Sequence, residues 1–206
     1  HLQAGPRAVA APAGVDAARW QRGEYLVNGP GHCGACHSPR DALGAERSGA
    51  AHLAGAWVDG WHAPSLRAAG RTTLPWSEAA LYGYLRRGHS AAHGVASGPM
   101  AEVVAGLTAA PDDDLRAMAH YLAWLQGAPD DAAVQQAAGQ LQRQARQAAP
   151  LPDAMQRFFD TACGACHSDG HAAVDLGLNL PLAANSKLRA EQPDNLLRVL
   201  LDGIQQ

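Results

Sequence analysis

Bulky apolar side chains recur at helical spacing in several stretches of the chain, and typical helix caps flank these stretches. The clearest is 112–126, where the apolar residues follow the 3.6-residue period, three aspartates occupy the first turn and Gly127 follows the last. The same pattern predicts further helices over 17–27, 77–87, 131–148, 153–162 and 194–201. No stretch shows a convincing strand pattern, so we expect an all-α protein.

All four cysteines fall in two copies of the pentapeptide Cys-Gly-Ala-Cys-His, at 33–37 and 163–167. Residues three apart on a helical turn project from one face, so two thiols at this spacing can reach the two vinyl groups of one haem. The His that follows lies on the same face, where its ring can ligate the iron. The sequence therefore predicts covalent haem c at Cys33 and Cys36 and at Cys163 and Cys166, with His37 and His167 as iron ligands.

Two other uses of paired cysteines stay open at this point. One is a thioredoxin-like redox dithiol, and the other is a structural zinc site that shares four thiols across the two motifs. The dithiol would want a βαβ context, which the pattern lacks, and neither reading explains a His directly after both pairs. Haem would also explain why so few aromatic residues, 5% of the chain, suffice, because the porphyrin is itself a large apolar body.

The residues around the two pentapeptides repeat as well. A predicted helix precedes each motif, and a second helix that ends at Gly88 or Gly203 follows it. The overlay predicts a second unit that is incomplete in this chain, because no Met and no closing helix follow it, unless His171 ligates its iron. The predicted organisation is an N-terminal segment over 1–15, a haem domain over 16–127, an Ala/Gln-rich helical linker over 128–152 and a second haem domain over 153–206.

Composition and charge narrow the classes of function. The net charge is −3 and Lys187 is the single lysine, so the chain lacks the clustered basic residues that nucleic acid requires. The longest lightly charged apolar stretch, 101–110, is too short to span a membrane, so membrane association would come only through parts missing from this chain. The chain starts at His1 without an apolar leader, from which we expect that a signal peptide, or something larger, was removed. Export and covalent haem favour the periplasm.

Five segments carry a resemblance to a known family: 23–27 (GEYLV), 31–40 (GHCGACHSPR), 60–64 (GWHAP), 76–78 (WSE) and 98–104 (GPMAEVV). They resemble class I cytochromes c, and more closely the multihaem cytochrome c subunits of bacterial periplasmic, membrane-associated dehydrogenases. The resemblance implies two tandem class I cytochrome c domains here and a third haem in the full-length protein. It implies that catalysis lies in a partner dehydrogenase subunit of flavin, quinone or molybdenum type, and that this chain relays electrons to quinone or a terminal oxidase.

The resemblance also suggests the sixth ligand of the first haem. The class I fold places its axial Met in a loop between two helices, and here Met100 follows Pro99 in such a loop. A Met/His pair raises the reduction potential relative to two His ligands, which suits electron transfer. His89 and His93 are rival ligands, expected to be ordinary loop histidines, and Met100 could instead simply pack the loop. The other methionines, Met118 and Met155, fall in helices and are expected in the core.

Three further residues are candidates for the surroundings of the haems. The backbone carbonyls of Pro64 and Pro181 are expected to accept a hydrogen bond from the second ring nitrogen of His37 and His167, respectively. Both prolines could equally be loop breakers. Arg40 follows His37 by three residues and is expected to pair with a haem propionate, since a guanidinium fork suits a carboxylate.

Two alternative functions remain beside the electron-transfer subunit. A free two-haem carrier would need no obligate partner and would have a Met ligand in both domains. A two-haem cytochrome c peroxidase would need one haem with an open or displaceable sixth position. The absence of any Met after His167 keeps the peroxidase open.

Overall fold

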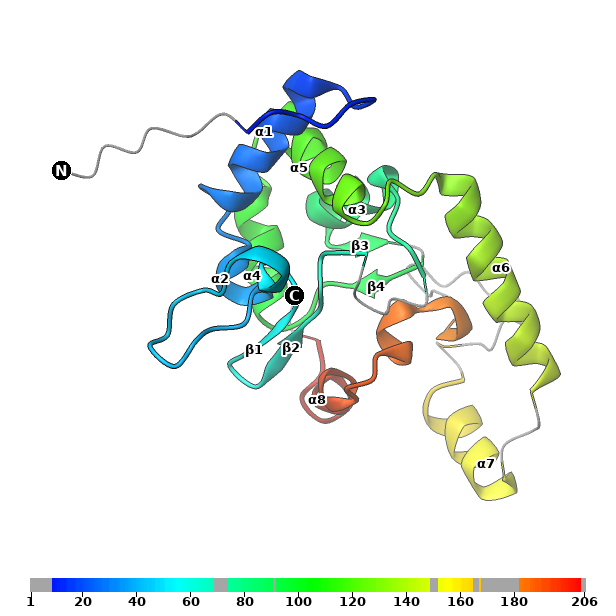
Figure 1. Ribbon diagram of the computed structural model, residues 1–206. Helices are drawn as coiled ribbons and strands as arrows, with labels where there is room; N and C mark the ends of the chain where they lie inside the picture. Colours follow the sequence, from blue (N-terminus) through cyan, green and yellow to red (C-terminus); the bar gives the residue numbers. More distant parts are fainter. Residues whose placement is uncertain are drawn as a thin grey trace.

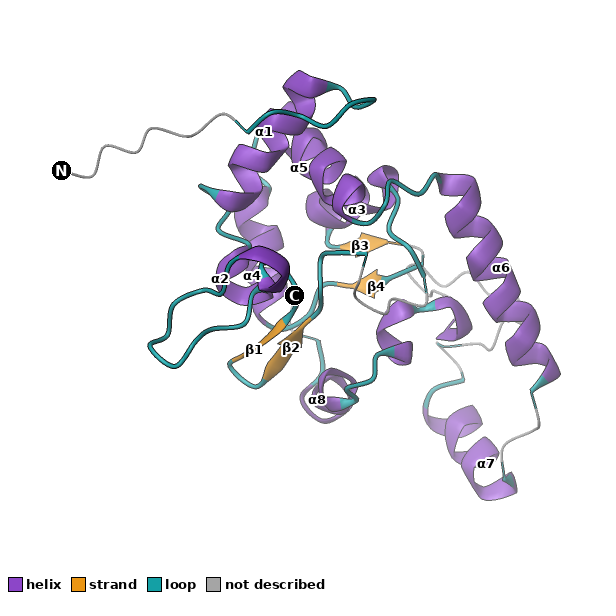
Figure 2. Ribbon diagram, in the orientation of Figure 1, coloured by secondary structure: helices purple, strands orange, loops and turns teal. Residues whose placement is uncertain are grey.

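The computed structural model describes residues 9–68, 74–90, 92–148, 152–164, 167 and 182–204. Within these ranges the chain is mostly helical (Figures 1 and 2). The six helices predicted from the sequence are all present, with ends that shift by one residue at most. The α-helices are α1 (Ala17–Asn28), α2 (Gly34–His37), α3 (Glu78–Arg87), α4 (Pro99–Leu107), α5 (Asp112–Leu125), α6 (Asp131–Gln147), α7 (Asp153–Ala162) and α8 (Asp194–Asp202), with 3-10 turns η1 (Gly49–Ala51), η2 (Leu182–Ala184) and η3 (Ser186–Arg189).

Two small hairpins and one helix differ from the sequence prediction. Strand β1 (Ala56–Val58) pairs with β2 (Trp61–Ala63), and β3 (His89–Ser90) pairs with β4 (Gly94–Val95), both antiparallel. The prediction of no strands is wrong here because strands of two or three residues are too short for alternation to show. Helix α4 lies within a stretch predicted as loop, and its start fits the preference of proline for the first helical position.

The core lies where α1 and α3 pack on α5 (Figure 1). Trp20 of α1 lies edge-on to Tyr121 and Trp124 of α5, with ring centroids 5.3 and 5.2 Å apart. Gly23 allows α1 to approach closely, because a Cβ atom there would lie 2.0 Å from the carbonyl oxygen of Ala117. The first pentapeptide therefore follows a helix that is fixed tightly in the core.

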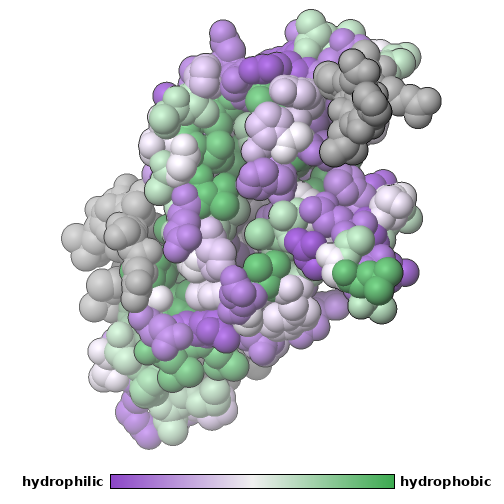
Figure 3. Space-filling view, turned by 90° about the vertical axis from the view of Figure 1, so that its left-hand side faces the viewer, coloured by the Kyte–Doolittle hydropathy of each residue, from purple (hydrophilic) through white to green (hydrophobic). Residues whose placement is uncertain are grey.

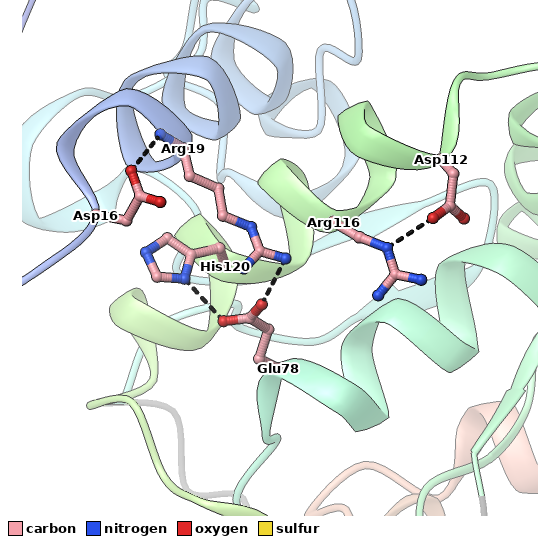
Figure 4. A network of polar contacts seen from close by, with 6 residues as sticks. All are labelled: Asp16, Arg19, Glu78, Asp112, Arg116 and His120. Atoms are coloured by element: carbon pink, nitrogen blue, oxygen red, sulfur yellow. Dashed lines mark hydrogen bonds and ion pairs between the residues drawn. The ribbon is translucent and has the colours of Figure 1, made fainter.

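A polar network ties the same three helices together (Figure 4). Glu78 at the start of α3 accepts hydrogen bonds from Arg19 of α1 at 2.9 Å and from His120 of α5 at 2.7 Å. On the same face, Arg116 donates to Asp112 at 2.6 Å within α5. The network adds specificity to the packing of α1, α3 and α5, although exposed ion pairs contribute little free energy.

Helix α6, in the predicted linker, packs against the domain formed by α1, α3 and α5, where it contacts α3. Its Val134 and Leu141 are buried together with Leu74. Asp131 at its start accepts a hydrogen bond from Ser77, the residue that caps α3. The segment is therefore helical as predicted, and it is anchored along its length.

The described segments after α6 carry α7, η2, η3 and α8. Helix α8 lies against β2, below the first hairpin in Figure 1. Apolar side chains on both helices are exposed, among them Phe158 (71%) on α7 and Leu201 (82%) on α8. Figure 3 shows the side of the molecule that lies on the left in Figure 1. On this side, exposed hydrophobic residues lie between hydrophilic ones.

Candidate haem-attachment site

Residues 33–37 form one helical turn, as their spacing predicts. The backbone N–H of His37 donates to the carbonyl oxygen of Cys33 at 2.9 Å. Cys33 and Cys36 are free, partly buried thiols. Burial raises the pKa of the Cys33 thiol to about 11, which disfavours the thiolate that a reactive dithiol requires. One helical turn therefore carries the two thiols, with Cys33 protonated, and the imidazole of His37.

The ring of His37 is oriented by Pro64. Its Nδ1 lies 2.7 Å from the carbonyl oxygen of Pro64, the contact that the sequence analysis expects. A carbonyl only accepts, so Nδ1 carries the proton of the neutral ring and Nε2 keeps a free lone pair. Burial lowers the pKa of His37, which favours this neutral form. The nitrogen that would ligate iron is thus in the required state.

A chain of hydrogen bonds holds the residues just after the motif. The buried Ser38 hydroxyl accepts from the Leu53 N–H at 2.8 Å and lies 3.4 Å from Nδ1 of His52. On its other side, Nε2 of His52 donates to Asn28 at the end of α1, at 2.8 Å. His52 is therefore a structural link between α1 and the loop after the pentapeptide.

The side chain of Arg40 stabilises the turn by hydrogen bonds to backbone carbonyl oxygens. Its guanidinium donates to the carbonyl oxygens of Gly44 at 2.7 Å and Ala35 at 3.1 Å. These bonds tie the following loop to α2. Pairing of Arg40 with a haem propionate stays a prediction, for which the remaining N–H groups are the donors.

Met100 lies in the first turn of α4 rather than in a loop. It is partly buried and packs against the core cluster that Cys33 also borders. The chain before it is fixed at Gly98, where φ is +56° and a Cβ atom would lie 2.4 Å from the ring of Trp61. Of the other methionines, Met118 is buried as expected, whereas Met155 is 58% exposed, which corrects its expected core position.

His93 is not the ordinary loop histidine that the sequence suggests. It is fully buried and stacks on Trp76, with ring centroids 3.6 Å apart and an angle of 9° between the planes. Its Nδ1 lies 2.9 Å from the hydroxyl of Ser186, and burial lowers its pKa to about 4. His89 is partly buried, with Nδ1 3.2 Å from the carbonyl oxygen of Arg87.

The described residues of the second pentapeptide keep one backbone hydrogen bond of the first. The backbone N–H of His167 donates to the carbonyl oxygen of Cys163 at 2.8 Å. Cys163 is partly buried and His167 is exposed. Cys166, His171 and Pro181 lie outside the described residues. Across the described ranges, no group of three or more His, Cys, Asp or Glu is arranged to hold a metal ion.

Two aromatic residues beside the first site belong to the segments 60–64 and 76–78 that carry the resemblance, but the sequence analysis gave them no role. Trp61 fixes Gly98, and Trp76 lies edge-on to Tyr84 in a buried cluster that Met100 also borders. The signal that could have found them was a tryptophan in a Gly- and Pro-rich loop, where a large apolar ring needs a specific partner.

The geometry of the first site fits the attachment of haem c: two thiols and a neutral imidazole with a free Nε2 share one helical turn. No protein-family model matches the chain. A nicotinate dehydrogenase subunit of Pseudomonas putida is 48% identical over 91% of this chain and 15% of its own length. The cytochrome c subunit of alcohol dehydrogenase (quinone) from Gluconobacter oxydans is 37% identical over 88% of the chain and 39% of its own length.

The cytochrome c subunit of gluconate 2-dehydrogenase from Pantoea cypripedii is 39% identical over 88% of the chain and 43% of its own length. The predicted resemblance to the cytochrome c subunits of dehydrogenases is therefore confirmed. The chain spans less than half the length of each of these three relatives.

Proposed function

We propose that this chain transfers electrons through covalently bound haem c, and that catalysis takes place in a partner dehydrogenase subunit. The observation that carries the proposal is the state of His37, whose Nδ1 is bonded to Pro64 while Nε2 is free, one helical turn from Cys33. When bound, the haem supplies an iron that gains and loses one electron.

The residues of the chain then have distinct tasks. At the first site Cys33 and Cys36 would attach the group, Pro64 orients the ring of His37, and His37 and Met100 would ligate the iron. At the second site Cys163, Cys166 and His167 repeat the attachment. These sites correspond to two tandem class I cytochrome c domains over 16–127 and 153–206, with a third haem in the full-length protein.

The names of the relatives support the partner and the location. Each of the three is a named subunit of a dehydrogenase, and two are named cytochrome c subunits. The partner of this chain is then a catalytic dehydrogenase subunit, and the acceptor is quinone or a terminal oxidase at the periplasmic face of the membrane. No helix in the described part of the chain is long and apolar enough to cross a membrane.

Haem staining and quantification on denatured protein tests the proposal. The chain, produced in a periplasm that attaches haem c, is expected to retain two haems after denaturation. The pair Cys33→Ala and Cys36→Ala should remove one, and the pair Cys163→Ala and Cys166→Ala the other. Four titratable free thiols, or bound zinc in place of haem, would overturn it. Rapid turnover of peroxide by the reduced protein would favour the peroxidase.

A further inference from the structure

The segment that follows the second pentapeptide pairs with the first hairpin through one side chain. Asn195 of α8 donates from Nδ2 to the carbonyl oxygen of His62 at 2.8 Å, and its Oδ1 accepts from the N–H of His62 at 2.8 Å. The amide group thus completes the open edge of β2 as a further strand would. Both residues are partly buried, which strengthens the pair by excluding water.

Three residues after Asn195 on α8, Arg198 lies over Trp61, which precedes His62 in β2. Its guanidinium carbon lies 5.8 Å from the ring centre of Trp61, within the range of a cation–π interaction. It also occupies the space beside Gly60, where a Cβ atom would lie 2.2 Å from Nη2 of Arg198. Helix α8 therefore contacts both the backbone and the aromatic ring of β2.

A second set of contacts joins the same segment to the other hairpin. Ser186 lies 2.9 Å from Nδ1 of His93, and Lys187 donates to the carbonyl oxygen of Val95 and, at 3.3 Å, to the hydroxyl of Tyr84. Residues 182–204 are therefore docked at two separate places on the domain that holds the first motif.

The strand that Asn195 pairs with leads directly to the support of His37. His62 precedes by two residues Pro64, whose carbonyl oxygen accepts from Nδ1 of His37 at 2.7 Å. Since the strand between them is short, a shift of His62 moves the acceptor that sets the ring of His37.

The ring that Arg198 covers supports the other expected ligand. Trp61 lies against Gly98, two residues before Met100, so closely that no Cβ atom would fit between them. A change in the position of Trp61 therefore alters the start of α4, where Met100 lies.

We propose that Asn195 and Arg198 are positioning residues for the first haem, acting through Pro64 on His37 and through Trp61 on Met100. Docking of residues 182–204 then determines how firmly His37 and Met100 would stay bound to the iron, and it tunes the reduction potential of the first haem. The inference rests on the proposed function, because it takes His37 and Met100 as the ligands. It means that electron transfer at the first haem depends on the chain that follows the second motif.

The test uses the haem-loaded chain and the variants Asn195→Ala and Arg198→Ala. The rate at which imidazole displaces the sixth ligand of the oxidised first haem is followed by loss of the methionine-to-iron charge-transfer band. We expect displacement to be roughly tenfold faster in Asn195→Ala, as follows from the loss of two hydrogen bonds, and less accelerated in Arg198→Ala. The potential of the first haem should shift while that of the second stays constant.

Matched variants separate positioning from general loss of structure. Arg198→Lys keeps a cation over Trp61, so its rate of ligand displacement should lie between those of the wild type and Arg198→Ala. Arg189→Ala is the control, since Arg189 bonds the Ala183 carbonyl within its own segment. Asn195→Asp, which keeps the acceptor for the His62 N–H but sets a carboxylate oxygen against the His62 carbonyl, serves if Asn195→Ala does not fold.

The outcomes are distinct. Unchanged rates and potentials in the Asn195 and Arg198 variants would overturn the inference and leave the proposed function intact, as would equal shifts at both haems or an equal effect of Arg189→Ala. A wild-type protein that binds haem but lacks the charge-transfer band would instead refute the Met100 assignment, and the inference with it.

Discussion

The Nδ1 atom of His37 lies 2.7 Å from the carbonyl oxygen of Pro64, across 27 residues of chain. This bond fixes both the tautomer and the direction of the ring, so the free Nε2 points away from the loop that orients it. The acceptor belongs to the backbone, which explains why a Pro, without a side-chain donor or acceptor, can serve here. The proposed haem site is therefore prepared by main-chain geometry as much as by side chains.

Met100→Ala is expected to remove the methionine-to-iron charge-transfer band and to lower the potential of the first haem. The reason is that Met/His ligation raises the reduction potential. Absorption spectra and a redox titration of the haem-loaded protein measure both effects. Met155→Ala is the matched control, because Met155 is exposed on α7. A band that persists in Met100→Ala would assign the sixth position to another residue.

Gly23→Ala is expected to destabilise the first domain by about 3 kcal/mol or more, because its Cβ atom would lie 2.0 Å from the backbone of Ala117. Backbone atoms cannot move aside as the end of a side chain can. Gly106→Ala is the control: that position, in α4, has nothing within 4 Å, and alanine there should stabilise by about 0.5–1 kcal/mol. Denaturant unfolding of both variants compares them. Equal stability would show that α1 and α5 do not pack this closely.

The helices and the first attachment turn were predictable because their signals are local. Caps such as Asp16 and Ser77 and the spacing of Cys33, Cys36 and His37 depend on residues within one or two turns. The Pro64 carbonyl could be proposed because a ligating His needs an acceptor for its second ring N–H, and a loop residue can supply a backbone carbonyl. The helices and the attachment turn required no knowledge of tertiary contacts, whereas the Pro64 bond spans 27 residues and was expected only from this need of a ligating His.

The missed features depend on contacts between residues distant in sequence. The burial of His93 results from Trp76 and Ser186, which lie on opposite sides of it in the chain. The pairing of Asn195 with His62 spans 133 residues. No periodicity marks such partners, and polar residues of this kind are usually exposed.

Glu78→Gln is expected to cost about 1 kcal/mol of stability at neutral pH, since it removes the negative charge that pairs with Arg19. The partners are partly exposed, so salt should reduce the difference between wild type and variant. Unfolding at low and high ionic strength measures it. The pair Arg22 and Asp114, also between α1 and α5, provides a control in Asp114→Asn, which leaves Glu78 intact. A difference that salt does not change would argue for a packing effect.

Acid is expected to weaken docking of residues 182–204 through His93. Burial lowers its folded pKa from 6.5 to about 4, so between these values the unfolded chain binds the proton that the folded chain excludes. Stability therefore falls as the pH drops from 6.5 to 4, by up to about 1.4 kcal/mol per pH unit. His93→Phe keeps the ring stacked on Trp76 and removes the titration, so its stability should fall less. Parallel loss of stability in both proteins would show that other groups cause it.

Alkali is expected to strengthen the same interface through Lys187. Removal from water lowers its folded pKa from 10.5 to about 8, because its amine lies against Val95 and Tyr84. Between pH 8 and 10.5 the unfolded chain therefore holds a proton that the folded chain has released, and stability rises with pH in that window. Lys187→Met replaces the amine with an apolar group of similar length and has no such titration. The difference in unfolding free energy between wild type and Lys187→Met, measured from pH 7 to 10.5, should move in favour of the wild type above pH 8. A difference that stays constant over this range would show that Lys187 keeps its charge when residues 182–204 are docked.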